Sequence, residues 1–171
     1  MNLTDGILWY VVFLLSTVFH EAAHAFTAHK MGDDTAYRIG QVSLNPVPHI
    51  KREPFGTVVV PVLSFLAGGW MIGWASTPYN PQWANNYPRK AAAMAAAGPI
   101  SNFILIIIAA VIIHLGIAIG FFYQPDTITI SSLVGGANAG WAESLAKIIS
   151  IMFSLNLILF VFNLLPVPPL D

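Results

Sequence analysis

Three long apolar stretches dominate the chain and set its architecture. They cover residues 6–29, 91–123 and 144–165. A helix that spans a bilayer needs about 20 consecutive apolar residues, so each stretch is long enough to cross a membrane. The first contains no charged side chain between residues 6 and 19, and Gly98-Pro99 interrupts the second near its start. The pattern predicts an all-α membrane protein with a core of three transmembrane helices.

A fourth apolar stretch, residues 55–76, is predicted to enter and leave the membrane on the same side. It contains the pair Gly68-Gly69. With this re-entrant path all Lys and Arg residues except Lys147 share one side. The positive-inside rule favours that arrangement, with the N-terminus outside and His24 near the cytoplasmic face. A complete fourth crossing is the alternative, and it would place Asp171 on the opposite side from His24.

Residues 39–46, which follow the first apolar stretch, carry a short strand pattern. Val42 and Leu44 alternate with polar neighbours, as in a half-buried strand. The pattern predicts a β-like edge segment, which could pair with an extended substrate. An ordinary loop at the membrane interface is the alternative interpretation.

The composition indicates an integral membrane protein. The 171 residues are 56% hydrophobic and 9% charged, with a mean hydropathy of +0.69. Soluble domains carry about 25% charged residues. The length fits a single domain over residues 1–171, and the net charge of −1 gives no reason to expect a nucleic-acid partner. Because the chain has no cysteine, a metal site would have to use histidine and carboxylate ligands.

The strongest chemical signal lies at the end of the first apolar stretch, where residues 20–24 read His-Glu-Ala-Ala-His. On a helix, two residues four positions apart differ by about 40° in direction and roughly 6 Å along the axis. The imidazoles of His20 and His24 can therefore bind one metal ion from the same helix face. Glu21 lies beside that face, where it can take a proton from a metal-bound water.

A catalytic zinc site needs a third protein ligand, and Asp171 is the best candidate. It follows Asn163 and a proline-rich break at the inferred cytoplasmic end of the third apolar stretch. The Asn163 amide could donate a hydrogen bond to an oxyanion. The other candidates fall in the far loop, lie deep in the second stretch, or suit a boundary or loop at the membrane surface. These candidates are His29, Asp33, Asp34, His49, Glu53, His114, Asp126 and Glu143.

Three separated motifs together resemble the site-2 protease family of intramembrane zinc metalloproteases. Residues 20–24 look like the family's H-E-x-x-H. Residues 97–102, Ala-Gly-Pro-Ile-Ser-Asn, resemble its A-G-P-x-x-N, and residues 163–171 resemble its N-x-x-P-x-x-x-L-D. The segments 43–50 and 54–57 are similar to a bacterial and archaeal branch that lacks extra soluble domains. The resemblance spans nearly the whole chain.

The resemblance implies a site and an activity. His20, His24 and Asp171 would bind one Zn²⁺, and Glu21 would be the general base. Asn163, and less strongly Asn102, would contact the scissile carbonyl or oxyanion. Members of the family cleave transmembrane proteins or signal peptides within the bilayer. A catalytically inert relative, or a metal-binding or transport protein of the membrane, is the alternative.

The resemblance also carries expectations about location and extent. A multi-pass protein of the cell membrane is expected, with its active site toward the cytoplasm. The family's third motif continues L-D-G into a further helix, whereas this sequence stops at Asp171. The metalloprotease core in residues 1–171 is therefore expected to be truncated at its C-terminus.

Overall fold

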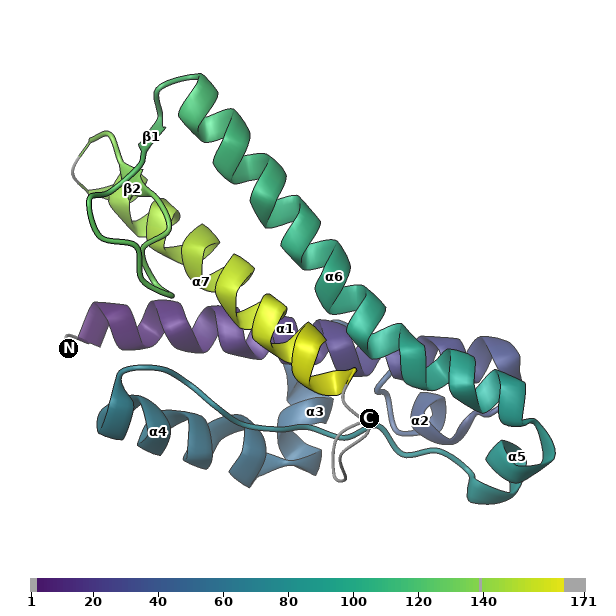
Figure 1. The fold of residues 1–171 in the computed structure, drawn as a ribbon. Coiled ribbons are helices and arrows are strands. Elements are labelled where there is room, and N and C mark those ends of the chain that lie inside the picture. The colour runs from purple at the N-terminus through teal and green to yellow at the C-terminus, as the bar shows by residue number, and fades with distance from the viewer. Residues whose placement is uncertain (1–2, 139, 165–171) are drawn as a thin grey trace.

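The computed structural model describes residues 3–138 and 140–164, and most of them are helical. Three long helices form the frame: α1 (Leu3–Met31), α6 (Pro88–Ala118) and α7 (Trp141–Asn163). α6 and α7 run antiparallel to each other, and both pack on α1 (Figure 1). All three are long and apolar enough to cross a membrane, which confirms the predicted three-helix core.

α6 continues through Gly98-Pro99 without a break. Pro99 has no N–H to donate to the carbonyl four residues earlier, which usually kinks or ends a helix. In the same turn the Ser101 hydroxyl donates a hydrogen bond to the Gly98 carbonyl at 2.7 Å. This side-chain bond satisfies a backbone carbonyl next to the proline. Pro88 starts the helix, where its fixed φ angle suits the first turn. α6 is therefore one helix of 31 residues.

The apolar segment after the first helix forms a hairpin of a short helix and an extended limb. A π-helical turn, η1 (Phe55–Val59), leads into α4 (Val60–Gly68). Together they extend about 21 Å at 1.5 Å per residue, which is less than the hydrocarbon core of about 30 Å. Gly69 then reverses the chain with a φ of +78°, and residues 70–80, here called the return limb, run back in extended form (Figure 1).

The two sides of the hairpin touch through glycine backbone. The Trp74 N–H donates to the Gly56 carbonyl at 3.1 Å. A Cβ atom on Gly73 would collide with that same carbonyl, and one on Gly56 would collide with the Trp74 carbonyl. Only glycine permits this approach, which brings the return limb back to the level at which the hairpin began.

The hairpin packs against α1 through the main hydrophobic cluster. Phe65 of α4 lies against Gly6, and Met71 belongs to the same cluster from the return limb. Lipid tails are as apolar as these side chains, so within a bilayer the cluster is held by close packing of its members. The cluster therefore joins α1, α7 and the hairpin into one unit. Its buried members are Trp9, Val12, Phe13, Phe65, Met71, Ile151 and Leu155.

Short helices connect these parts, and the strand predicted over residues 39–46 does not form. The connecting helices are α2 (Thr35–Arg38), α3 (Pro46–Arg52) and α5 (Pro81–Asn86). The Ser43 hydroxyl accepts from the Asn45 N–H, and the Asn45 side chain caps α3 by accepting from Val47. These local bonds favour bends and a helix start over a strand ladder. The described strands lie in the connection between α6 and α7, as β1 (Phe122–Tyr123) and β2 (Gly135–Gly136), which pair antiparallel.

Candidate metal centre

His20 and His24 converge on the inner face of α1. Their Nε2 atoms are 3.0 Å apart, and their rings meet edge to face at an interplanar angle of 79°. The exposed fractions of the two residues are 6% and 5%. The pair was predicted from its four-residue spacing, and the structure brings both imidazoles to one point.

The outer nitrogen of each ring is held by α6. His24 Nδ1 lies 2.7 Å from the backbone carbonyl of Met94, and His20 Nδ1 lies 2.5 Å from Asn102 Oδ1. A carbonyl can only accept, so Nδ1 of His24 must carry the proton and its Nε2 presents a lone pair. Metal-binding histidines usually donate their other N–H to such an acceptor, which fixes the ring orientation.

Gly98 lets the backbone of α6 come close to the two Nε2 atoms. A Cβ at this position would collide with Nε2 of His24 and would lie 2.5 Å from Nε2 of His20. α6 can therefore cross the imidazoles only with bare backbone at this point. Two imidazole nitrogens this close together are a donor set that suits Zn²⁺.

Glu21 is buried next to the histidines and is held from the return limb. The Thr77 hydroxyl lies 2.8 Å from Glu21 Oε2 and 2.9 Å from the Glu21 backbone carbonyl. Glu21 is 5% exposed. Thr77 thus links the hairpin to the motif on α1 across 56 positions of sequence. No local pattern pointed to Thr77, because its partner is distant in the chain.

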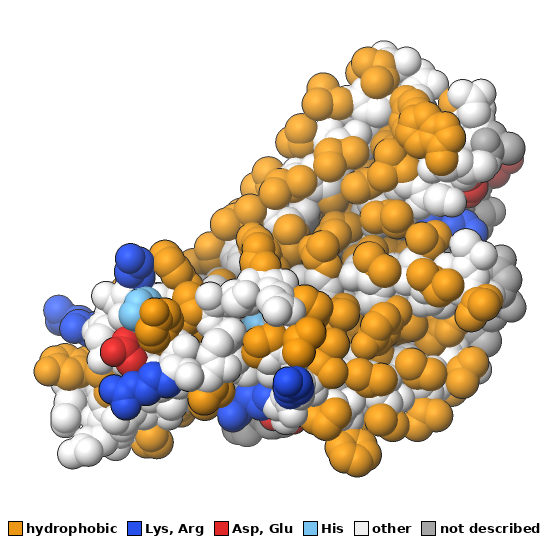
Figure 2. Space-filling view, turned by 180° about the vertical axis from the view of Figure 1, so that it is seen from behind, with side chains coloured by type: hydrophobic (Ala, Val, Ile, Leu, Met, Phe, Trp, Pro, Cys, Tyr) orange, Lys and Arg blue, Asp and Glu red, His pale blue; other side chains and the backbone are white. Residues whose placement is uncertain are grey.

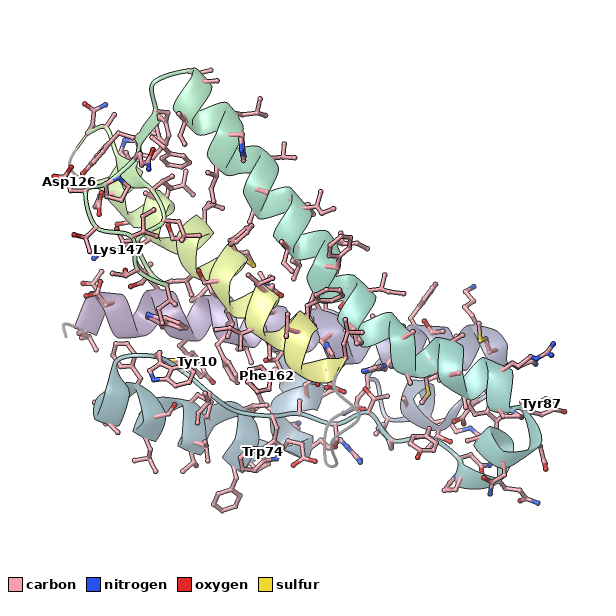
Figure 3. The ribbon with its side chains drawn as sticks, in the orientation of Figure 1. Tyr10, Trp74, Tyr87, Asp126, Lys147 and Phe162 are labelled. Carbon is pink, nitrogen blue, oxygen red and sulfur yellow. The ribbon has the colours of Figure 1, made fainter. Side chains whose placement is uncertain are left out.

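Two cavities border Glu21. One, of about 580 Å³, is lined by Glu21, His24, Thr77 and small side chains at the start of α6. The other, of about 410 Å³, is lined by His20, Glu21, Trp74, Phe162 and Asn163. Figure 3 shows Trp74 on the return limb and Phe162 near the end of α7. Asn163, predicted as an oxyanion donor, is half-buried and lies in the same cavity as His20 and Glu21.

The predicted third ligand, Asp171, lies outside the described residues. Within residues 3–138 and 140–164 no three His, Asp or Glu side chains are grouped closely enough to hold a metal ion. The described part of the site is therefore a pair of histidines beside a carboxylate.

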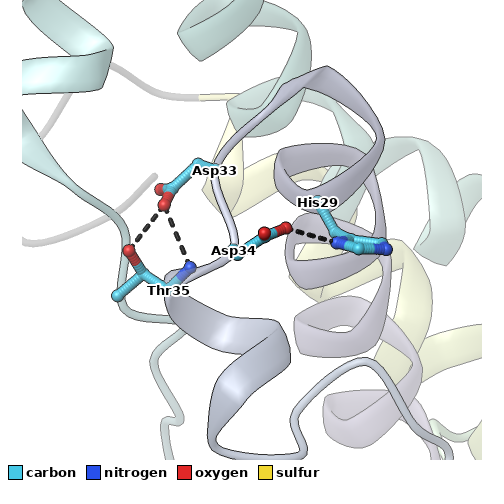
Figure 4. Close-up of polar contacts among 4 residues, drawn as sticks. All are labelled: His29, Asp33, Asp34 and Thr35. Carbon is cyan, nitrogen blue, oxygen red and sulfur yellow. Dashed lines mark hydrogen bonds and ion pairs between the residues drawn. The ribbon is translucent and has the colours of Figure 1, made fainter.

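The candidate third ligands that closely follow residues 20–24 bond nearby residues and lie away from the two histidines. His29 Nδ1 pairs with Asp34 Oδ1 at 2.7 Å, and its ring stacks on Tyr37 (Figure 4). Asp33 accepts hydrogen bonds from the Thr35 hydroxyl and N–H, and from the Asn80 N–H at 2.8 Å. These contacts fit the boundary role that the sequence suggested for this region.

The Asp33 carboxylate has a pKa below its ordinary value. Burial by itself would raise the pKa, but it is outweighed by the hydrogen bonds from the Thr35 hydroxyl and from the backbone N–H groups of Asn80 and Thr35, with help from the charge of Arg38. Asp33 is therefore ionised at neutral pH. Its charge fastens the far end of the return limb to the loop that follows α1.

The remaining candidate third ligands also lie away from the two histidines. His49 is buried in α3 with Nε2 3.0 Å from the Ser43 carbonyl, and His114 bonds the Ala110 carbonyl of its own helix. The Glu53 carboxylate accepts from the Ser76 hydroxyl at 2.6 Å. Glu143 accepts from the Gly136 N–H in the connection between α6 and α7, and Asp126 lies in that same connection (Figure 3).

Comparison with known proteins identifies relatives over most of the chain. The sequence profile of peptidase family M50 matches residues 8–171. A protein of Bacillus subtilis named "Putative zinc metalloprotease YwhC" is 37% identical over 163 residues, covering 94% of this chain and 64% of that protein. "Putative zinc metalloprotease Rip2" of Mycolicibacterium smegmatis is 27% identical over 158 residues, covering 92% of this chain and 51% of that protein.

The chain thus spans between about half and two thirds of the length of these relatives. Both of their names carry zinc, the metal that the sequence predicts for residues 20–24. No solved structure gives a significant match.

Proposed function

Because the chain belongs to peptidase family M50, the site-2 protease family, we propose that it is a zinc-dependent endopeptidase that hydrolyses peptide bonds of transmembrane substrates. One observation carries the proposal. Two imidazole Nε2 atoms converge 3.0 Å apart with a buried carboxylate beside them, on a helix apolar enough to cross a membrane. Ionisable groups at such depth are costly and usually functional.

The proposed zinc ligands are His20, His24 and Asp171. When bound, zinc polarises the scissile carbonyl and lowers the pKa of its water toward neutrality. The two Nε2 atoms lie 3.0 Å apart, so one cation could take both of them as ligands. Asp171 supplies the carboxylate that the histidines lack.

In the proposed reaction Glu21 is the general base. Its carboxylate takes a proton from the attacking water and passes it to the leaving amine. The Thr77 hydroxyl holds one carboxylate oxygen in place, so the other oxygen is available to the water. Asn163, in the same cavity, donates a hydrogen bond to the oxyanion that forms on the substrate carbonyl.

Asn102 has a different proposed role from the contact with substrate that the sequence motif implied. One end of its amide meets His20 and the other meets Asn156, and the residue is fully buried. With both ends engaged, Asn102 orients a zinc ligand instead of binding the peptide.

The charge distribution supports a cytoplasmic active site. Figure 2 shows blue Lys and Arg side chains at one end and along the lower edge of a mostly apolar surface, with a further one on the opposite side. Of the seven Lys and Arg residues, Lys147 is set apart: it pairs with Asp5 at 2.8 Å near the beginning of α1. By the positive-inside rule the first end is cytoplasmic, and the start of α1 is outside. The six residues that the re-entrant path would place on the cytoplasmic side are Lys30, Arg38, Lys51, Arg52, Arg89 and Lys90.

The test is Glu21→Gln in the full-length protein, co-expressed with a single-span membrane substrate. The amide cannot take the proton, so we expect cleavage to fall at least 100-fold, in line with typical general-base contributions. Zinc content should be unchanged, since Glu21 is not a ligand. Glu143→Gln, remote from the histidines, serves as the matched control and should cleave normally. Cleavage at the wild-type rate by Glu21→Gln would contradict the proposed function.

A further inference from the structure

A line of fully buried polar side chains connects α7 to the metal centre. Asn156 of α7, Asn102 of α6 and Ser16 of α1 each have no exposed surface. Burying an amide among apolar helices is unfavourable unless its hydrogen bonds are made. The contacts run from the Met152 carbonyl through Asn156 and Asn102 to His20.

The backbone carbonyl at one end fixes the direction of every bond in this line. Asn156 lies 2.8 Å from the Met152 carbonyl, and a carbonyl can only accept, so the amide NH₂ of Asn156 faces it. Asn156 Oδ1 therefore faces Asn102 and accepts from its Nδ2 at 2.7 Å. Asn102 Oδ1 is then left facing His20 Nδ1. Amide orientations are ordinarily ambiguous, but here one backbone group decides both.

We propose that Asn156 is a positioning residue that sets the tautomer of His20. With Asn102 Oδ1 facing it, His20 Nδ1 must carry the proton, and Nε2 presents the lone pair that binds a metal. If the Asn102 amide turned over, its Oδ1 would meet Asn156 Oδ1, and two acceptors would oppose each other. Asn156 therefore prevents the orientation in which Asn102 would donate to Nδ1 and leave Nε2 protonated. The inference rests on the proposed zinc site.

The two histidines are thus oriented by different means. Nδ1 of His24 meets the Met94 carbonyl directly, so the backbone of α6 fixes its tautomer. His20 depends on two side chains, the second of them on α7. A shift of α7 relative to α6 would therefore change the orientation of His20 but not that of His24.

The test compares zinc affinity among variants of the purified full-length protein, by competition with a chelator. Asn156→Leu removes the acceptor that holds Asn102, and we expect zinc to bind about 10–100-fold more weakly, the usual effect of losing an outer partner of a metal ligand. Asn156→Asp keeps an oxygen facing Asn102 Nδ2 but loses the donor to the Met152 carbonyl, so its loss of zinc affinity should be clearly smaller than that of Asn156→Leu. Ser16→Ala is the matched control, because Ser16 bonds Asn156 without lying between Met152 and His20.

The outcomes separate this role from a structural one. Equal losses of zinc affinity in Asn156→Leu and Asn156→Asp, or wild-type affinity in Asn156→Leu, would overturn the proposal. A second measurement needs no variant: ¹⁵N spectra of the histidine rings in the metal-free wild-type protein should show a protonated Nδ1 on His20. A protonated Nε2 with a bare Nδ1 would refute the role of Asn156. Failure of the wild-type protein to bind zinc would count against the proposed function alone, since the ring spectra test the tautomer without metal.

Discussion

At the scale of single residues, the site depends on what is missing at position 98. The backbone of α6 passes the two imidazoles at Gly98, and a Cβ there would collide with both Nε2 atoms. Gly98 costs helix stability, about 1 kcal/mol relative to alanine. Its place next to Pro99, inside a long helix, is therefore explained by the site and not by the helix.

Gly98→Ala should weaken zinc binding by at least tenfold. The added methyl collides with both Nε2 atoms, and relieving such overpacking typically costs about 1–3 kcal/mol. Zinc affinity of the purified protein measures the effect. Gly116→Ala is the control: Gly116 lies in the same helix, but its methyl would collide with Phe122 of β1, away from the histidines. It should lower the unfolding temperature comparably and leave zinc affinity intact; a similar loss of zinc in both variants would refute a specific role for Gly98.

At the scale of elements, the return limb is the part that serves the site. It is anchored near its middle, where Arg52 donates to the Ser76 carbonyl at 3.1 Å, and at its end, where the Asn80 N–H donates to Asp33. Thr77 lies between these anchors and meets Glu21. The limb has no regular secondary structure, so side-chain and backbone contacts at fixed points give it its position.

Thr77→Val should lower kcat by about tenfold, because a lost hydrogen bond to a charged group is worth about 1.5 kcal/mol or more. Valine keeps the shape of threonine but cannot hold the Glu21 carboxylate. Thr77→Ser, which retains the hydroxyl, should recover most of the rate. Cleavage kinetics and zinc content of the same preparations provide the measurement, and zinc content should not change in either variant. Equal rates in both variants would show that the hydroxyl does not matter.

At the scale of the whole molecule, the hairpin decides which ends of the helices share a side. The end of α1 and the start of α6 both belong to the positively charged end if residues 55–76 turn back. Lys51 and Lys90 are both exposed there. A complete crossing would put them on opposite sides of the membrane.

The absence of cysteine makes this arrangement simple to test. Lys51→Cys and Lys90→Cys, made singly, should both resist a membrane-impermeant maleimide in intact cells and react in inverted vesicles. Asp126→Cys, in the connection between α6 and α7, should behave in the opposite way. Labelling of Lys51→Cys and Lys90→Cys from different sides would contradict the hairpin.

The sequence predicted those features of the fold that depend on composition or on residues close together in the chain. Apolar length predicted α1, α6 and α7, and helical spacing brought His20 and His24 together. The strand over residues 39–46 was wrong because Ser43 and Asn45 bond the nearby backbone, which alternation of apolar residues does not reveal. Asn156 and Thr77 were missed for another reason. Their partners lie 54 and 56 positions away, so only the folded chain shows what each of them holds.

The return limb has a consequence for the order of events during turnover. The cavity at the start of α6 and the cavity at the end of α7 both reach Glu21, and the limb contributes residues to each. A peptide that enters beside α7 would leave the other approach open to solvent. In the proposed reaction, water could then be replenished while the carboxylate product is still bound, so consecutive cuts in one substrate would not require its release.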